Sequence, residues 1–392
     1  MKITMTSFDQ NLILTPHDAL ERYRDELYLY KADGRLAILP GVIGTVFFER
    51  GSKPDVRQGI LACFDRFEQM FGEHLKGGKD KDLGGFTKRT PKGLEAIRSA
   101  ILETPPYYKV SVVRSSATDE NTAAEYQITT LTNNELSQDY CQPGEKNVWP
   151  KGCDGGQLSF LKFHMPMDFV VNLQGIEQYE SFLRFVCEHL PVRGGYGGLS
   201  PIRPYRSDNY CVEQERVLAK RFSGLEIDSD AFIKKDNYVV RSYKGKPSER
   251  AYTFYPYPHP GAKVKDYGFI KGVNWYTLIG DVFVNRLGGE MAVRKSLARP
   301  DIGVERIDAC LLIRAGNFPR LGAPEEGLPE PYVFVNSLLR VLRRPSVLEI
   351  VRGPDMWIAR FDLPNAPPIP SPPKVLPGDL GTVDTGTNDE LP

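Results

Sequence analysis

The segment GFIKGVNWYTLIGDVFVNRLGG, residues 268–289, decides how the C-terminal half of this chain is expected to fold. Asn274 is of a residue type preferred at the start of a helix. The apolar side chains after it recur at the three- and four-residue spacing of one helix face, namely Trp275, Leu278, Ile279, Val282, Phe283 and Leu287. The pair Gly288-Gly289 then supplies residues that end helices in the left-handed conformation. The spacing predicts a helix over residues 274–287.

A second segment, IRAGNFPRLG at residues 313–322, predicts a sharp turn after a buried strand over residues 309–313. Glycine accepts backbone conformations that other residues avoid, and Pro319 fixes a bend. A further amphipathic helix is expected over residues 331–344. We expect structural roles for the residues that mark the two segments, namely Asn274, Trp275, Asp281, Gly288, Gly289, Gly316, Pro319 and Gly322.

Strands and amphipathic helices mix elsewhere without the strict alternation of a doubly wound sheet. A β-rich stretch at residues 36–49 precedes a helix expected over 55–76, and an apolar run at 158–171 precedes a helix expected over 175–190. This order predicts an α+β fold with two related strand-helix lobes of mixed or antiparallel sheet, packed helices and a disordered C-terminal tail.

The expected organisation has four parts. These are an N-terminal extension at residues 1–35, an N-terminal α+β lobe at 36–145, a C-terminal α+β lobe at 146–363 that carries the quoted segments, and a tail at 364–392. The boundary between the lobes falls in a polar, glycine-rich stretch. Seven prolines lie between Pro364 and Pro377, and the polar residues after them bury too little apolar surface to offset the entropy of ordering.

Charge and composition exclude several classes of partner. Fifty lysines and arginines balance fifty aspartates and glutamates, which gives no basis for nonspecific attraction to nucleic acid or anionic membranes and disfavours a wholesale DNA mimic. The N-terminus lacks a signal-peptide core, and no run reaches the roughly 20 apolar residues of a membrane span. We expect a cytoplasmic protein without a direct nucleic-acid or membrane partner.

The usual motifs of catalysis and metal binding do not occur in the sequence. The six cysteines show no C-x-x-C pair, and the five histidines lie far apart. There is no phosphate-binding loop, no G-x-S-x-G elbow and no acid-x-Lys step of the kind that metal-dependent nucleases use. We therefore assign no catalytic residue, no metal site and no cofactor, and expect a protein that is not an enzyme.

Four short patterns together resemble a known family. They are the Gly-Tyr-Gly-Gly step at residues 195–198, the G-V-N-W-x-T-x-x-x-D pattern at 272–281, L-G-G at 287–289 and A-G-x-x-P-x-L-G at 315–322. In this order they resemble the TsiV-like immunity proteins of bacterial type VI secretion, and the resemblance covers residues 36–344. The chain departs from the family by reading Gly-Ala-Pro-Glu after Leu321, where an acidic Gly-Asp step is expected.

The resemblance implies an immunity protein that binds and neutralises a cognate antibacterial toxin in bacterial competition. The implied toxin is a VRR-NUC or related restriction-enzyme-type nuclease that acts on DNA in the cytoplasm, and the implied mechanism is occlusion of its active site or DNA cleft. Two alternatives stay open, namely a hydrolase or nucleic-acid enzyme with an unrecognised site, and a structural adaptor of the secretion apparatus. The oligomeric state also stays open.

Two polar loops are candidates for contact with a toxin. One is AYTFYPYPHP at residues 251–260, because tyrosine provides contact area at low entropic cost, and the other is an acidic turn at 324–330 that suits a basic partner surface. Both also fit structural roles, as a loop packed on its own domain and as a solvated helix entry. The candidate contact residues are Tyr252, Tyr255, Tyr257, His259, Glu325, Glu326 and Glu330.

Overall fold

The long strand β2 (Leu36–Phe48) is the centre of the fold, because every residue after Leu36 in it is buried. The computed structural model describes residues 13–80, 85–105, 108–132, 158–206, 209–228, 270–343 and 358–367. A strand that is buried on both faces must be paired on both edges and covered on both sides. β7 (Ser159–Pro166) and β8 (Val192–Ile202) pair with its two edges, both antiparallel.

The other elements are shorter and lie on both sides of this centre. In chain order they are α1 (Pro16–Leu27), β1 (Leu29–Tyr30), α2 (Pro54–Phe71), β3 (Gly77–Lys79), β4 (Thr87–Lys88), α3 (Pro91–Glu103), β5 (Ser111–Ser115), β6 (Gln127–Leu131), the 3-10 helix η2 (Met167–Val170), α4 (Leu173–His189), α5 (Asn209–Arg221), β9 (Tyr276–Gly280), α7 (Asp281–Arg286), α8 (Glu290–Ser296), β10 (Ile302–Ile307), β11 (Cys310–Ala315), α9 (Glu330–Leu339) and the 3-10 helix η4 (Arg340–Leu342).

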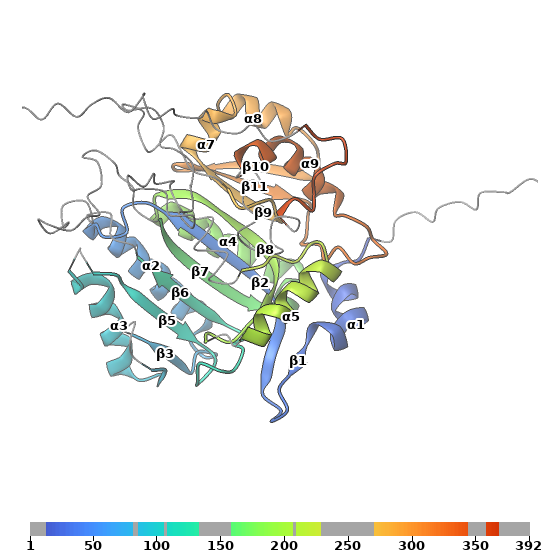
Figure 1. Ribbon diagram of the computed structural model, residues 1–392. Coiled ribbons are helices and arrows are strands. Elements are labelled where there is room, and N and C mark those ends of the chain that lie inside the picture. The colour runs from blue at the N-terminus through green and yellow to red at the C-terminus, as the bar shows by residue number, and fades with distance from the viewer. Residues whose placement is uncertain are drawn as a thin grey trace, which may run out of the picture.

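The eleven strands of the described residues form one sheet in the order β10-β11-β9-β8-β2-β7-β6-β5-β3-β4, with β1 added beside β2. Figure 1 shows this sheet as a continuous layer, with α4 behind the strands and α5 in front of them. Since strands far apart in sequence lie side by side, the sheet joins residues from the whole described chain. An α+β fold with an antiparallel sheet is confirmed.

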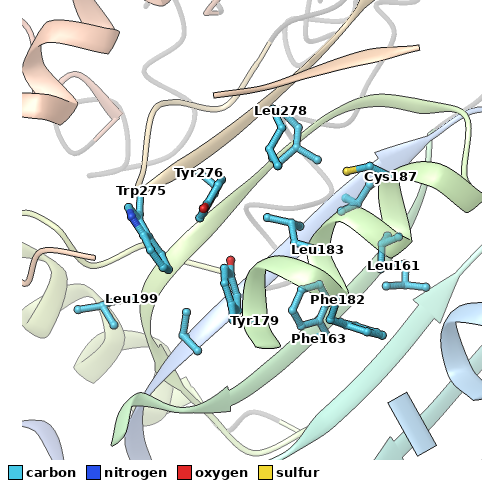
Figure 2. Close-up of a cluster of buried hydrophobic side chains, with 14 of the residues drawn as sticks. Leu161, Phe163, Tyr179, Phe182, Leu183, Cys187, Leu199, Trp275, Tyr276 and Leu278 are labelled. Atoms are coloured by element: carbon cyan, nitrogen blue, oxygen red, sulfur yellow. The ribbon is translucent and has the colours of Figure 1, made fainter. Parts of the chain in front are cut away.

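The main apolar core lies between the sheet and the helices α2 and α4. Tyr179 of α4 is fully buried, stacks on Trp275 with ring centroids 5.4 Å apart, and donates a hydrogen bond of 2.7 Å to the carbonyl of Ile43. Phe182, one turn further along α4, contacts Phe67 of α2 at 5.4 Å. Figure 2 shows these α4 side chains grouped with residues of β7 and β9. Each large apolar side chain buried in this way stabilises the fold by roughly 1.5–3 kcal/mol.

Glycines in β8 allow these groups to approach the sheet closely. A Cβ atom on Gly197 would lie 2.1 Å from the Tyr179 hydroxyl, and one on Gly198 would lie 2.0 Å from the side-chain oxygen of Asn274. Successive residues of a strand face opposite sides of a sheet. The Gly-Tyr-Gly-Gly step therefore makes room for α4 on one face and for Asn274 on the other.

Several expected elements are confirmed with shifts at their ends. α2 and α4 correspond to the helices expected over residues 55–76 and 175–190, β11 to the strand expected over 309–313, and α9 with η4 to the helix expected over 331–344. α4 begins at the N-cap Asn172, whose side chain accepts a hydrogen bond from the Gly175 N–H.

The helix expected over residues 274–287 is wrong in its first half. Tyr276 to Gly280 form the strand β9, which pairs with β8 on one side and β11 on the other, and only Asp281 to Arg286 are helical. All five residues of β9 are buried. A short run buried on both faces carries no period that separates helix from strand, so pairing with two neighbouring strands decides its conformation.

The predicted lobe boundary at residue 145 lies outside the described residues. Strands from its two sides pair directly, since β2 lies between β7 and β8. Part of the expected N-terminal extension also joins the fold, because α1 buries Leu20, Tyr23 and Leu27 and β1 pairs with β2. The division into two lobes stays a prediction about chain organisation, and most of the predicted tail, from residue 368, lies outside the described residues.

We expect Gly197→Ala to lower the free energy of unfolding by about 1–3 kcal/mol, because the new methyl group would displace the Tyr179 hydroxyl from Ile43. Gly272→Ala is the control, since no described atom lies within 4 Å of a Cβ there. Urea unfolding of both variants measures the difference. Equal unfolding midpoints would show that the close approach of α4 to β8 does not constrain the fold.

Candidate functional site

A row of polar side chains crosses the sheet on the face opposite α4. The strand register places Thr129, Lys162, Thr45, Tyr196 and Thr277 beside one another on β6, β7, β2, β8 and β9. Thr45 and Thr277 are fully buried, and Tyr196 is 2% exposed. Buried polar groups need hydrogen-bond partners, so this row requires a polar layer above it.

Asp228 lies over the middle of this row. Its carboxylate accepts hydrogen bonds from the Thr45 hydroxyl at 3.0 Å and the Tyr196 hydroxyl at 2.7 Å. Its second oxygen lies 2.6 Å from the Lys162 ammonium nitrogen. The carboxylate therefore joins β2, β7 and β8 through their side chains.

A second ion pair lies next to the first. The Lys271 ammonium is 2.9 Å from the Glu226 carboxylate and donates a hydrogen bond of 3.3 Å to the Tyr196 hydroxyl. Asn274 donates to the other oxygen of Glu226 at 3.0 Å. Glu215 of α5 accepts from the Asp228 N–H at 3.0 Å. We call Lys162, Tyr196, Glu215, Glu226, Asp228 and Lys271 the buried ionic network.

The pKa values of two of the three acids in this network, Asp228 and Glu215, are shifted in opposite directions. Burial opposes ionisation of Asp228, but the nearby Lys162 and Lys271 charges outweigh it and hold the pKa of Asp228 below its usual value. Burial raises the pKa of Glu215, although Arg203 acts in the opposite direction. Two of these acids also pair with arginines, since Arg203 lies 3.4 Å from Glu215 and Arg360 lies 3.6 Å from Glu226.

The network is turned inward. Glu215, Glu226 and Asp228 are 1%, 2% and 3% exposed, and they bond to one another's segments and to the sheet. Among the described residues, no group of His, Cys, Asp and Glu is arranged to hold a metal ion. This arrangement can fix chain segments in place, and it presents no carboxylate of the network to a ligand in solution.

The network brings together two residues that are far apart in the sequence, since Asp228 and Lys271 both contact the Tyr196 hydroxyl. Residues 229–269 between them lie outside the described residues. The predicted contact residues Tyr252, Tyr255, Tyr257 and His259 belong to the intervening segment and lie outside the described residues.

The acidic turn is placed beside α1. Glu325 pairs with Arg22 at 3.3 Å, and Glu330 pairs with Arg299 at 2.6 Å. Glu326 has a different role, because it is nearly buried and accepts backbone hydrogen bonds from Leu14 and Ala323, both at 2.9 Å. Glu325 and Glu330 therefore face solvent, whereas Glu326 fastens the start of the described chain to the turn.

The residues of the two sequence motifs pack together. The Trp275 indole N–H donates to the carbonyl of Gly316 at 3.2 Å, and Asp281 pairs with Arg306 at 2.6 Å. Positive φ angles occur at the four motif glycines, which are Gly288, Gly289, Gly316 and Gly322. Pro319 is buried in the turn. These residues hold the C-terminal strands against the segment that carries Glu226.

Sequence reasoning did not find the buried ionic network. Lys162 stands alone in the apolar stretch LSFLKFHMP at residues 158–166, and Lys271 stands alone in GFIKGVNW at 268–275. A lysine inside an apolar run is costly to bury without a partner, so such positions indicate an internal ion pair.

Comparison with known proteins identifies the class to which this protein belongs. A family model described as TsiV, type VI immunity for VRR-NUC, matches residues 59–246 and 258–362. The chain belongs to this family of type VI immunity proteins. The match covers every residue of the buried ionic network and both sequence motifs.

The fold also occurs in a solved structure. A Pseudomonas aeruginosa T6SS protein, PA0821, is 19% identical, with a TM-score of 0.65 over 89% of this chain and 92% of that one. No curated protein matches this sequence. Within the described residues, none of the helices is both long and apolar enough to cross a membrane.

Asp228→Ala should lower the free energy of unfolding by about 3–5 kcal/mol, because it removes the carboxylate that pairs with the largely buried Lys162 ammonium and accepts hydrogen bonds from the buried Thr45 and Tyr196 hydroxyls. The matched control is Asp65→Ala, which breaks a 2.8 Å pair between exposed Asp65 and Arg98 and should cost about 1 kcal/mol or less. Chemical denaturation measures both. Similar losses of unfolding free energy in the two variants would show that the buried network contributes no more to stability than an exposed ion pair.

His164 makes stability depend on pH. It is buried on β7, and burial, reinforced by the Lys162 charge, lowers the pKa of His164 to about 3. An unfolded histidine titrates near pH 6.5. Since the folded state resists protonation, its stability is complete above about pH 6.5 and declines as the pH falls toward 3.

Between pH 7.5 and 5 this single group should remove about 2 kcal/mol from the free energy of unfolding. The difference in the free energy of unfolding, native protein minus His164→Gln, should fall by this amount between pH 7.5 and pH 5. The comparison cancels titrations that the two proteins share. A difference that stays constant with pH would show that His164 titrates in the fold as it does in the unfolded chain.

Proposed function

We propose that this protein protects a cell by binding a cognate VRR-NUC toxin in the cytoplasm and covering its active site or DNA cleft, without catalysing a reaction itself. The family match across most of the chain is the observation that carries this proposal. The inhibitor would need a standard interface of about 800 Å² on each partner. Inhibition by coverage requires a rigid scaffold, which the continuous sheet provides.

The absence of turnover is part of the proposal. The buried acids and lysines contact one another rather than an open site, which supports a binding function over the alternative of an unrecognised hydrolase. The purified protein should leave DNA, RNA and common hydrolase substrates intact with or without Mg²⁺. Metal-dependent turnover that survives repurification and is lost on replacing one carboxylate would contradict this.

The candidate interface comprises Tyr252, Tyr255, Tyr257 and His259 with the exposed acids Glu325 and Glu330. A nuclease needs basic groups around its cleft to bind DNA phosphates, so acidic and aromatic groups suit its surface. Glu326 is better left unchanged in tests, since it holds Leu14 and Ala323.

The decisive experiment is a titration of the cognate nuclease with this protein, read as DNA cleavage. Inhibition should be complete near one equivalent. Glu325→Lys with Glu330→Lys should slow association several-fold at low salt, because like charges then face the basic cleft. Tyr255→Ala with Tyr257→Ala should mainly speed dissociation.

Glu95→Lys is the matched control, since Glu95 is an exposed acid on α3, away from the turn. It should bind as the native protein does. A native protein that neither binds nor inhibits the nuclease would refute the proposed function. Association with secretion machinery in place of the nuclease would favour the adaptor alternative.

A further inference from the structure

Aromatic side chains from three separate segments form a platform beside the start of β6. The His74 ring stacks on Tyr126 at 4.4 Å, and Phe71 beneath them contacts Tyr126 at 5.1 Å and Phe169 at 5.5 Å. Phe71 is buried, but Tyr126 and Phe169 are half-buried and His74 is exposed. The platform therefore offers ring surface to solvent on an apolar support.

A further tyrosine and two carboxylates border this platform. Tyr28 follows α1, which packs beside η2, and its ring is half-buried. Glu125 and Asp168 are exposed, and neither has an ion-pair partner among the described residues. Glu125 directly precedes Tyr126, Asp168 directly precedes Phe169, and the Arg24 guanidinium lies 5.2 Å from the centroid of the Tyr28 ring. Burial raises the pKa of both Tyr28 and Tyr126; the charges of Asp168 and Glu125 add to the effect, and Arg24 opposes it at Tyr28.

The backbone under these groups is held in place. The Tyr126 N–H donates to the Ser116 hydroxyl at 3.1 Å, and the Ser116 N–H donates to the Tyr126 carbonyl at 2.8 Å. Buried His164 bonds the carbonyl of Ala124 at 3.0 Å. A surface fixed in this way loses little conformational entropy on binding.

We propose that Tyr28, His74, Glu125, Tyr126, Asp168 and Phe169, here called the Tyr126 surface, dock the basic DNA-contacting face of the toxin. This inference rests on the proposed function and adds a second contact surface to the tyrosine-rich segment and the acidic turn. It follows from the chemistry of the surface, because exposed carboxylates accept charge-assisted hydrogen bonds from arginine and lysine, and the partly exposed rings beside them provide contact area.

Charge complementarity selects the toxin over other occupants. A nuclease must present lysine and arginine to DNA phosphates, whereas a nucleic acid would meet Glu125 and Asp168 with like charge. A second copy of this chain in a symmetric contact would bring the same two carboxylates toward one another, which is unfavourable.

The test uses the full chain and the cognate nuclease, with binding rates measured at low and moderate salt. Glu125→Lys with Asp168→Lys should slow association about tenfold or more at low salt, and by less as salt screens the charges. Tyr126→Ala should speed dissociation about tenfold or more, whereas Tyr126→Phe, which keeps the ring, should stay within about threefold of the native rate.

Glu177→Lys with Glu95→Lys is the control pair, because these acids are exposed on α4 and α3. Native-like rates for the Glu125 and Asp168 variant would overturn the Tyr126 surface while leaving immunity intact. That variant keeps the test valid if Tyr126→Ala unfolds, since both acids are exposed. Self-association that the same variant abolishes would also overturn it, whereas failure of the native protein to bind the nuclease would refute the function itself.

Discussion

The carboxylate of Asp228 is the contact on which the arrangement of the chain depends. It joins side chains of β2, β7 and β8 at one point, and the ammonium of Lys271, 43 residues later in the sequence, donates to the same Tyr196 hydroxyl. Desolvating these ions costs several kcal/mol each, and their mutual attraction offsets that cost only when every partner is present. The network therefore contributes less to net stability than to specificity. A wrongly placed segment would leave a charge buried and unpaired, so one arrangement is strongly preferred.

Much of the fold follows from local sequence, and the misassigned part has a physical reason. The helices α2 and α4 show a clear apolar stripe, because each has one face on the core and one toward solvent. β9 has no such contrast, since all five of its residues are buried. Its assignment depends on pairing with β8 and β11, which are distant in sequence. Non-local pairing of this kind cannot be read from a window of neighbouring residues.

The candidate site was harder to predict than the fold for the same reason. The motif glycines and Trp275 stand out in the sequence because their backbone geometry and size are unusual, and the structure gives them packing roles. Glu226 and Asp228 carry no local signature, and the lone Lys162 in an apolar run indicates an ion pair without naming its partner, which only the folded chain shows. Glu326 shows the converse case. An acid in an exposed-looking turn proves to be a buried acceptor for backbone N–H groups.

A protein with zero formal net charge can still bind a basic partner if its charges are locally arranged. Some exposed acids in the described chain are neutralised nearby, as Asp65 is by Arg98 and Glu330 by Arg299. Glu125 and Asp168 have no ion-pair partner among the described residues, and each directly precedes a half-buried aromatic residue, Tyr126 and Phe169. The field of the whole chain would then be weak, and attraction to a basic cleft would come from local groups of carboxylates. Such an arrangement would discriminate between toxins by shape and local charge rather than by general affinity for basic proteins.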